Sequence, residues 1–125
     1  MRFSISIDHK HKIIRYKHSG IIQSEDIEEA WAKFLKMPEF TQMNYDLLSD
    51  YRHGRFNIVQ SQLVHIIEFL QAVEPIIKGK KQALIVDDPY SVAASMIFVK
   101  EVYEKLGFIV KVFATEEAAF NWIRY

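Results

Sequence analysis

Two arginines lie among aromatic residues in the stretch 51–56 (YRHGRF). Arg52 and Arg55 each carry a planar guanidinium that can donate two parallel hydrogen bonds, an arrangement that suits phosphate or carboxylate. Further along the chain, Tyr90 and Ser91 stand at a predicted helix start, where free backbone N–H groups and the helix dipole favour an anion. These four residues are therefore candidates for anion binding.

Three aspartates form a second candidate site because they follow predicted buried strands. Asp50 ends one apolar stretch, and Asp87 with Asp88 follows another, at 83–86. The carboxyl ends of parallel strands meet at one edge of a sheet, and carboxylates are ligands that Mg²⁺ prefers. A magnesium-dependent phosphotransfer site is thus one hypothesis. The alternative is that these acids cap helices or line loops, and that Arg52 and Arg55 pair with Asp50 and nearby glutamates.

An apolar connection follows the first predicted helix. Met37, Phe40 and Met43 surround Pro38 there. Such residues can form a lid over a hydrophobic pocket or meet another subunit. The alternative is that they cover the end of the core.

Composition excludes several classes of protein. The chain has 125 residues, 16 basic and 16 acidic side chains, and no cysteine. Balanced charge lacks the basic excess typical of nucleic-acid binding, and no apolar run approaches the length of a bilayer span. The first residues alternate between apolar and polar rather than forming a signal peptide, so we expect a cytoplasmic protein.

The residue types that would indicate an enzyme are also missing. We find no nucleophile–base pair, no cysteine and no His-x-x-x-His spacing typical of zinc ligands. We therefore expect no catalytic residue, no metal and no cofactor.

Hydrophobic periodicity predicts the elements that position these candidates. Alternation at period two predicts an antiparallel hairpin over 3–7 and 13–18. Further strands are expected at 45–50, 83–86 and 108–113. Four helices are expected after caps at Ser24, Asn57, Asp88 and Thr115, with Pro38 and Pro75 ending the first two. For the third helix, the spacing predicts a buried stripe through Val92, Met96, Val99, Tyr103 and Leu106.

The resulting order, ββαβαβαβα, defines the expected fold class. A hairpin followed by helix–strand alternation predicts an α/β fold with a mixed five-stranded sheet covered by four helices. No linker or repeat interrupts the pattern. We therefore expect a single domain over residues 1–125.

This layout resembles the SpoIIAA-like branch of the STAS domains. The resemblance is carried by the opening hairpin and by the segments SEDIEEAW, YDLLSDYR, QALIVDD and FATEEAAFNWI. It implies a bacterial cytosolic regulatory or binding domain without enzymatic activity, related in fold to lipid-carrying SEC14-type domains.

The resemblance also implies a phosphorylated serine at the helix start after a central strand, in regulatory members. The matching turn here reads SDYRHG, with Ser49 before the acid, and so departs from the acid-serine-serine-glycine pattern. Ser91, at the start of the third helix, is physically better placed to carry a phosphate. The alternative is that Ser91 serves only the helix start.

Three functional hypotheses follow. The first is a non-enzymatic regulatory or protein-interaction module that binds a protein partner or forms a homodimer. The second is a carrier or sensor of a small amphipathic or lipid-like ligand, supported by the Met37–Met43 connection and the two arginines. The third and least supported is the magnesium-dependent phosphotransfer domain.

Overall fold

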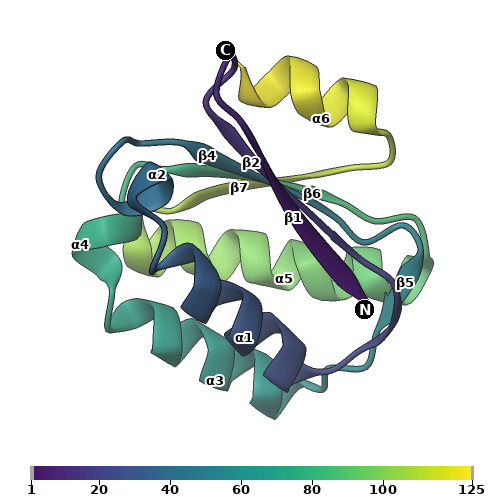
Figure 1. Ribbon diagram of the computed structural model, residues 1–125. Coiled ribbons are helices and arrows are strands. Elements are labelled where there is room, and N and C mark those ends of the chain that lie inside the picture. The colour runs from purple at the N-terminus through teal and green to yellow at the C-terminus, as the bar shows by residue number, and fades with distance from the viewer. Residues whose placement is uncertain (1, 125) are drawn as a thin grey trace.

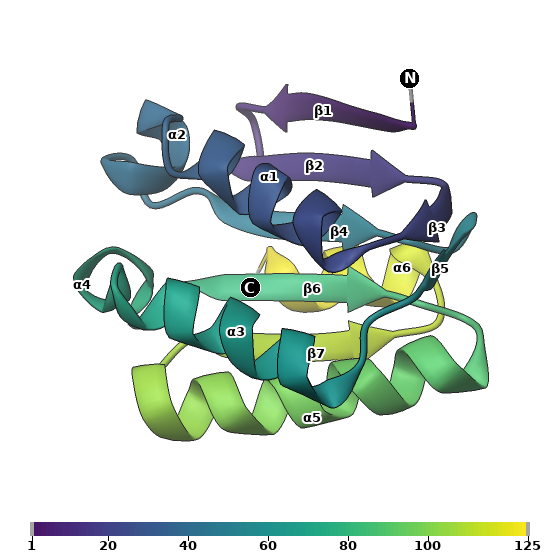
Figure 2. The ribbon, with the colours of Figure 1, turned by 90° about the horizontal axis from the view of Figure 1, so that it is seen from below.

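A five-stranded mixed sheet forms the centre of the computed structural model, which describes residues 2–124. Its strands are β1 (Phe3–Asp8), β2 (Ile13–His18), β4 (Asp46–Asp50), β6 (Lys81–Ile85) and β7 (Ile109–Phe113). Figure 2 shows the order β1-β2-β4-β6-β7, in which β1 alone is antiparallel to its neighbour. The expected mixed five-stranded sheet is therefore confirmed.

The strand order follows the chain order, and this determines where the helices lie. Right-handed crossovers that always advance in one direction place every crossover helix on the same face of the sheet. Accordingly α1 (Ser24–Phe34), α3 (Gln60–Gln71) and α5 (Pro89–Leu106) cover one face, whereas α6 (Glu116–Ile123) lies alone on the other (Figure 1). We call these the three-helix face and the α6 face.

Two of the helices in the structure were not expected. α2 (Pro38–Thr41) and α4 (Glu74–Ile77) are single turns with proline at their start. Each proline therefore does more than end the preceding helix, because its fixed φ also suits the first turn of a new one. The described residues thus contain six helices rather than four.

A two-stranded parallel ribbon was also not expected. It joins β3 (Gly20–Ile22) to β5 (Gly54–Phe56). A Cβ at Gly54 would lie 2.6 Å from Ile22 Cδ1 and 2.9 Å from the Gly20 carbonyl oxygen. Only glycine permits this approach of the two backbones. The ribbon was not predicted because strands of three residues are too short to show a recognisable alternation in the sequence.

Helix caps agree with the expectation at two of four sites. Asp88 accepts the Ser91 N–H at 3.0 Å, and Thr115 accepts the Ala118 N–H at 3.2 Å. The other two helices begin at different residues, since their caps are Gln23 and Val59 rather than Ser24 and Asn57. At Val59 the backbone N–H donates to the Gln62 side chain at 2.9 Å, so the reciprocal carboxamide stabilises this start.

The buried stripe of α5 differs from the expected one. The buried residues are Ser91, Ser95, Phe98, Val102 and Leu106, whereas Met96 and Tyr103 are more than half exposed. α5 carries apolar residues on several sides, so periodicity does not identify its inner face. No helix within residues 2–124, α5 included, is long and apolar enough to cross a membrane.

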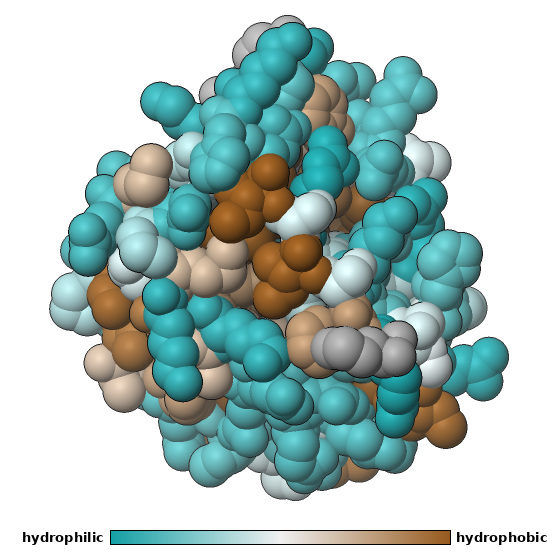
Figure 3. All heavy atoms as spheres, in the orientation of Figure 1, coloured by the Kyte–Doolittle hydropathy of each residue, from teal (hydrophilic) through white to brown (hydrophobic). Residues whose placement is uncertain are grey.

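The sheet separates two cores. Alternate residues of the hairpin face α1, as expected from the register in which Ile5 lies opposite Tyr16 and Ile7 opposite Ile14. The larger core fills the three-helix face and the smaller one, which includes Leu48, Ile85 and Ile123, lies under α6. At the sheet edge the cover is incomplete, and Figure 3 shows apolar surface over β1.

Candidate functional site

The guanidinium of Arg52 is engaged by Asp50. Arg52 Nε donates to Asp50 Oδ1 at 3.0 Å and its Nη2 to Oδ2 at 2.7 Å, and the Arg52 backbone N–H also donates to Oδ1. Burial alone would raise the pKa of Asp50, but these hydrogen bonds outweigh it and lower that pKa. The ion-pair alternative is therefore confirmed for Arg52. Arg55 is exposed on β5 and contributes to the lowered pKa of Asp88.

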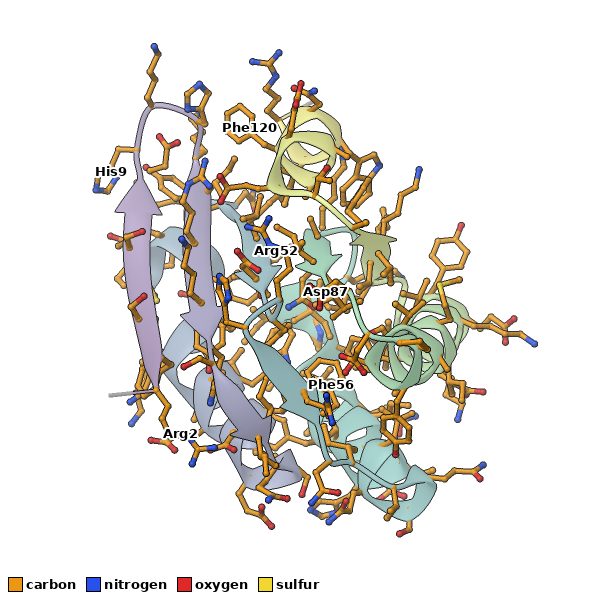
Figure 4. The ribbon with its side chains drawn as sticks, turned by 90° about the vertical axis from the view of Figure 1, so that its right-hand side faces the viewer. Arg2, His9, Arg52, Phe56, Asp87 and Phe120 are labelled. Carbon is orange, nitrogen blue, oxygen red and sulfur yellow. The ribbon has the colours of Figure 1, made fainter. Side chains whose placement is uncertain are left out.

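The three aspartates do not form a metal site. Asp50 is paired with Arg52, and Asp88 Oδ2 accepts the Ser91 N–H. Figure 4 shows Asp87 in the same region as Arg52. The charge of Asp87 raises the pKa of Arg52, but to a lesser extent than Asp50 does. Within residues 2–124, no three acidic or histidine side chains group closely enough to hold a metal ion. The geometry of the described residues therefore gives the magnesium hypothesis no support.

Ser91 and Tyr90 hold backbone groups rather than an open anion site. Ser91 is buried, and its Oγ accepts the Phe56 N–H at 3.1 Å. These contacts favour the alternative in which Ser91 serves the fold over the one in which it carries a phosphate. Tyr90 is half exposed and its hydroxyl donates to the Ile58 carbonyl at 2.7 Å.

The three apolar residues of the connection after α1 differ in burial. Phe40 is fully buried, so its expected role as a lid or interface residue is wrong, whereas Met43 is exposed and Met37 partly buried. The Phe40 carbonyl accepts a hydrogen bond from Lys80 Nζ at 2.8 Å, and the ammonium also donates to Asn44 Oδ1 at 3.0 Å. Burial lowers the pKa of Lys80. Through its two hydrogen bonds, the Lys80 side chain holds this connection against the start of β6.

An apolar cavity lies on the three-helix face. Its volume is about 50 Å³, and α1, α3, α5 and the sheet surround it. Most of its lining is aliphatic or aromatic: Ile27, Trp31, Tyr51, Phe56, Ile58, Leu63, Ile66, Leu84, Ala94 and Phe98. We call it the central cavity.

Two polar side chains also line the central cavity. Ser95 and Gln82 are 2% and 3% exposed, and neither Ser95 Oγ nor Gln82 Oε1 has a hydrogen-bond partner among the described residues. The Gln82 amide nitrogen donates to Ser49 Oγ at 3.1 Å, which fixes the side chain. Apolar walls with a few convergent polar atoms are typical of small-molecule sites.

The loop 51–56 reaches this cavity through its rings rather than its arginines. Tyr51 and Phe56 pack edge to face, with centroids 5.0 Å apart, and both line the cavity. Burial raises the pKa of Tyr51, so its phenol stays neutral. Sequence reasoning missed Gln82 and Ser95. The available signals were a glutamine beside the apolar run 83–86, and a serine one helical turn after Ser91.

On the α6 face, by contrast, a polar trough lies over β1 and β2. It is lined in part by Ser4, Ser6, Arg15 and Lys17, and Arg15 Nη1 lies 3.4 Å from Glu116 Oε1. Its charged groups stand near one another, so they compensate within the trough.

Comparison with known proteins shows what the fold resembles. No family model matches the chain, and no curated protein matches it in sequence. An uncharacterised protein of the DUF3478 family from Shewanella loihica PV-4, described as having a SpoIIAA-like fold, matches with a TM-score of 0.62 and 14% identity. This match covers 97% of this chain and 93% of that one.

The anti-sigma factor antagonist SpoIIAA in its unphosphorylated form is a second match. It has a TM-score of 0.55 and 15% identity, over 98% of this chain and 97% of that one. The expected SpoIIAA-like fold is thereby confirmed. At these identities the likeness concerns the fold alone.

Proposed function

We propose that this protein is a cytoplasmic, non-enzymatic regulatory module of STAS type that binds a small amphipathic ligand in the central cavity. The observation that carries the proposal is the pair of buried, unpartnered polar atoms, Ser95 Oγ and Gln82 Oε1, in an apolar cavity. Leaving a polar atom buried without a partner costs about 1–3 kcal/mol. A ligand that supplies the missing hydrogen bonds recovers part of this cost.

The chemistry of the lining defines the ligand class. Gln82 Oε1 only accepts hydrogen bonds, so the polar end of the ligand must donate one. A buried ion would be penalised in these apolar surroundings, which favours a neutral hydroxyl over a carboxylate. The walls that include Ile27 and Leu63 suit an apolar group, and the volume of about 50 Å³ restricts that group to about the size of a methyl. We therefore propose a neutral aliphatic alcohol or an equivalent group.

The lack of an enzymatic role is supported by how the candidate chemical groups are used. The carboxylate of Asp50 is bound by Arg52, and the Ser91 hydroxyl is bound by a backbone N–H. These groups serve the fold. The SpoIIAA-like fold further supports a regulatory role.

The test uses methanol, formate and methane as probes of the purified full chain, because a cavity of about 50 Å³ admits only a ligand of this size. Titration followed by nuclear magnetic resonance should show methanol binding more tightly than either of the other two. The Ser95→Ala variant should bind methanol about tenfold more weakly, since one hydrogen bond is worth about that factor. Ser61→Ala, at an exposed serine of α3 outside the lining, should bind it normally. Equal binding of all three probes, or no binding of methanol, would refute the proposal.

A second candidate function is self-association through the outer face of α5. Met96, Ile97 and Tyr103 lie on one side of this helix and are all more than half exposed. A second copy of this chain is the occupant we propose, since an isologous contact buries the same stripe on both partners. Lys100 and Glu104 are exposed on the same side of α5, and a two-fold contact can pair the lysine of one copy with the glutamate of the other.

Sedimentation at increasing protein concentration tests this candidate. We expect a dimer that Met96→Glu disrupts and that Met43→Glu, at an equally exposed methionine on a different element, leaves intact. A monomer at every concentration, or equal effects of the two variants, would reject it.

A further inference from the structure

A second pocket lies where β1 starts and β2 ends, beside α1. It has a volume of about 190 Å³ and is separate in lining from the central cavity. Its walls are formed by Arg2, Phe3, Tyr16, His18, Asp26, Glu29, Ala30 and Lys33. Figure 4 shows Arg2 at this end of the hairpin, opposite the turn that carries His9.

A buried histidine defines the floor of this pocket. His18 is 5% exposed, and its Nδ1 lies 2.6 Å from the Tyr16 hydroxyl oxygen. Burial raises the pKa of Tyr16, so the phenol keeps its proton. Burial also lowers the pKa of His18, against the opposing influence of Asp26 and Glu29. The imidazole is therefore neutral, and we assign the Tyr16 hydroxyl as the donor to Nδ1, which places the imidazole proton on Nε2.

The Nε2–H group has no acceptor of its own. His18 Nε2 is buried without a hydrogen-bond partner among residues 2–124. Phe3 lies against the imidazole, with ring centroids 6.1 Å apart, and helps to hold it in place. An unpartnered donor on a residue that lines a polar pocket calls for an explanation, and a ligand that brings an acceptor supplies one.

Charges of both signs line the same pocket. Arg2 donates to the Ile21 carbonyl, and Lys33 Nζ lies 3.9 Å from Glu29 Oε1 and 5.4 Å from the Phe3 ring centre. Asp26 Oδ2 accepts the Gln23 N–H at 2.8 Å. Each of these groups retains capacity for another partner, because guanidinium, ammonium and carboxylate groups all form several hydrogen bonds.

We propose that this pocket binds a small free amino acid. Its carboxylate would accept the His18 Nε2–H and face Arg2 and Lys33, while its ammonium group would donate to Asp26 and Glu29. Two cations and two anions around one neutral donor match a ligand that carries one charge of each sign. The volume exceeds that of a cavity of about 150 Å³ that accommodates benzene, which has as many heavy atoms as alanine, so a small amino acid fits.

Nuclear magnetic resonance of the full chain tests this proposal directly. The probes are L-alanine, propionate and ethylamine, of which the last two each carry one of alanine's two charged groups. We expect millimolar L-alanine to shift the His18 Nε2–H signal, and the other two probes to shift it about tenfold less at equal concentration. An equal response to propionate would reject the assignment to amino acids. An unchanged signal with every probe would reject the site.

Variants separate a binding role from a structural one. Glu29→Gln removes one ammonium acceptor from an exposed side chain, so the fold should persist while alanine binding weakens about tenfold. Glu25→Gln, on the same helix but outside the lining, is the matched control and should bind normally. His18→Phe should abolish binding, and its folding is checked by thermal unfolding. Equal binding by Glu29→Gln and Glu25→Gln would overturn the proposal.

Discussion

The two faces of the sheet differ in whether their buried polar groups have hydrogen-bond partners. On the three-helix face, Gln82, Ser95 and His18 each leave one polar atom without a partner among the described residues. On the α6 face, the buried carboxylate of Asp50 is held by both nitrogens of the Arg52 fork. Satisfied polar groups stabilise a fold, whereas unsatisfied ones destabilise it and call for an explanation. This contrast is the basis on which we propose ligand binding on the three-helix face and a structural role for the α6 face.

The largest expected effect compares the two cores. Phe34→Ala on the three-helix face should lower the free energy of unfolding by about 3–5 kcal/mol, since Phe34 is buried against Tyr16 and Trp31. Ile123→Ala, under α6, should cost about 2–3 kcal/mol because fewer atoms are removed from a smaller core. Urea denaturation measures both. A larger loss for Ile123→Ala would mean that α6 anchors the fold.

The next effect concerns the ion pair of the α6 face. Arg52→Ala should cost about 2–3 kcal/mol at pH 7, because it leaves the carboxylate of Asp50 buried without its partner. Arg55→Ala, at an exposed position, is the control and should cost less than about 0.5 kcal/mol. If both variants lose the same stability, Asp50 does not depend on Arg52.

The same pair predicts a pH dependence. The pKa of Asp50 is lowered by folding, so its stabilisation is present above the ordinary aspartate pKa of about 3.9 and is lost as the pH falls through the folded value. The difference between wild type and Arg52→Ala should therefore shrink on acidification. Denaturant titrations at a series of pH values measure this difference. A constant difference down to about pH 2 would contradict the assignment.

A smaller and more discriminating effect compares two serines one turn apart on α5. Both are 2% exposed, but Ser91 accepts the Phe56 N–H and Ser95 has no partner among residues 2–124. Ser91→Ala should lose about 1–2 kcal/mol, whereas Ser95→Ala should leave stability unchanged or raise it by up to about 1 kcal/mol. Both gain the same helix propensity, so the comparison isolates the hydrogen bond. Losses of the same size would show that Ser95 is satisfied.

The smallest effect belongs to an exposed pair outside both faces. Glu101 and Lys105 lie four residues apart on α5, with 2.9 Å between carboxylate and ammonium. Glu101→Ala should cost no more than about 0.5 kcal/mol, and about 1 M salt should remove the difference. Thermal unfolding at low and high salt measures it. A loss of the size seen for Arg52→Ala would abolish the distinction between buried and exposed pairs.

The sequence predicts most of this fold because strong local patterns produce it. Alternation in the hairpin and the caps at Asp88 and Thr115 are local signals, and both are confirmed. The β3–β5 ribbon and the inner face of α5 were missed, since both depend on contacts between segments distant in the chain.

The candidate sites were less predictable than the fold. Asp50 and the arginines were recognised as a charged group, but whether a guanidinium faces a ligand or a neighbouring carboxylate is decided in three dimensions. Gln82, Ser95 and His18 stand out only when their hydrogen-bond partners can be sought, and sequence spacing carries no such information. What distinguishes them is an unsatisfied atom rather than a residue type.

The chain order of the strands has a consequence for synthesis of the protein. Each new strand pairs with the one placed before it, so the sheet grows at a single edge from the hairpin towards β7. Each strand can thus dock as soon as its crossover helix has been made, and domains emerge N-terminal end first. Until β7 is in place, however, β6 presents an unpaired edge on which another chain could add a strand, and in the finished sheet β7 takes over this edge position.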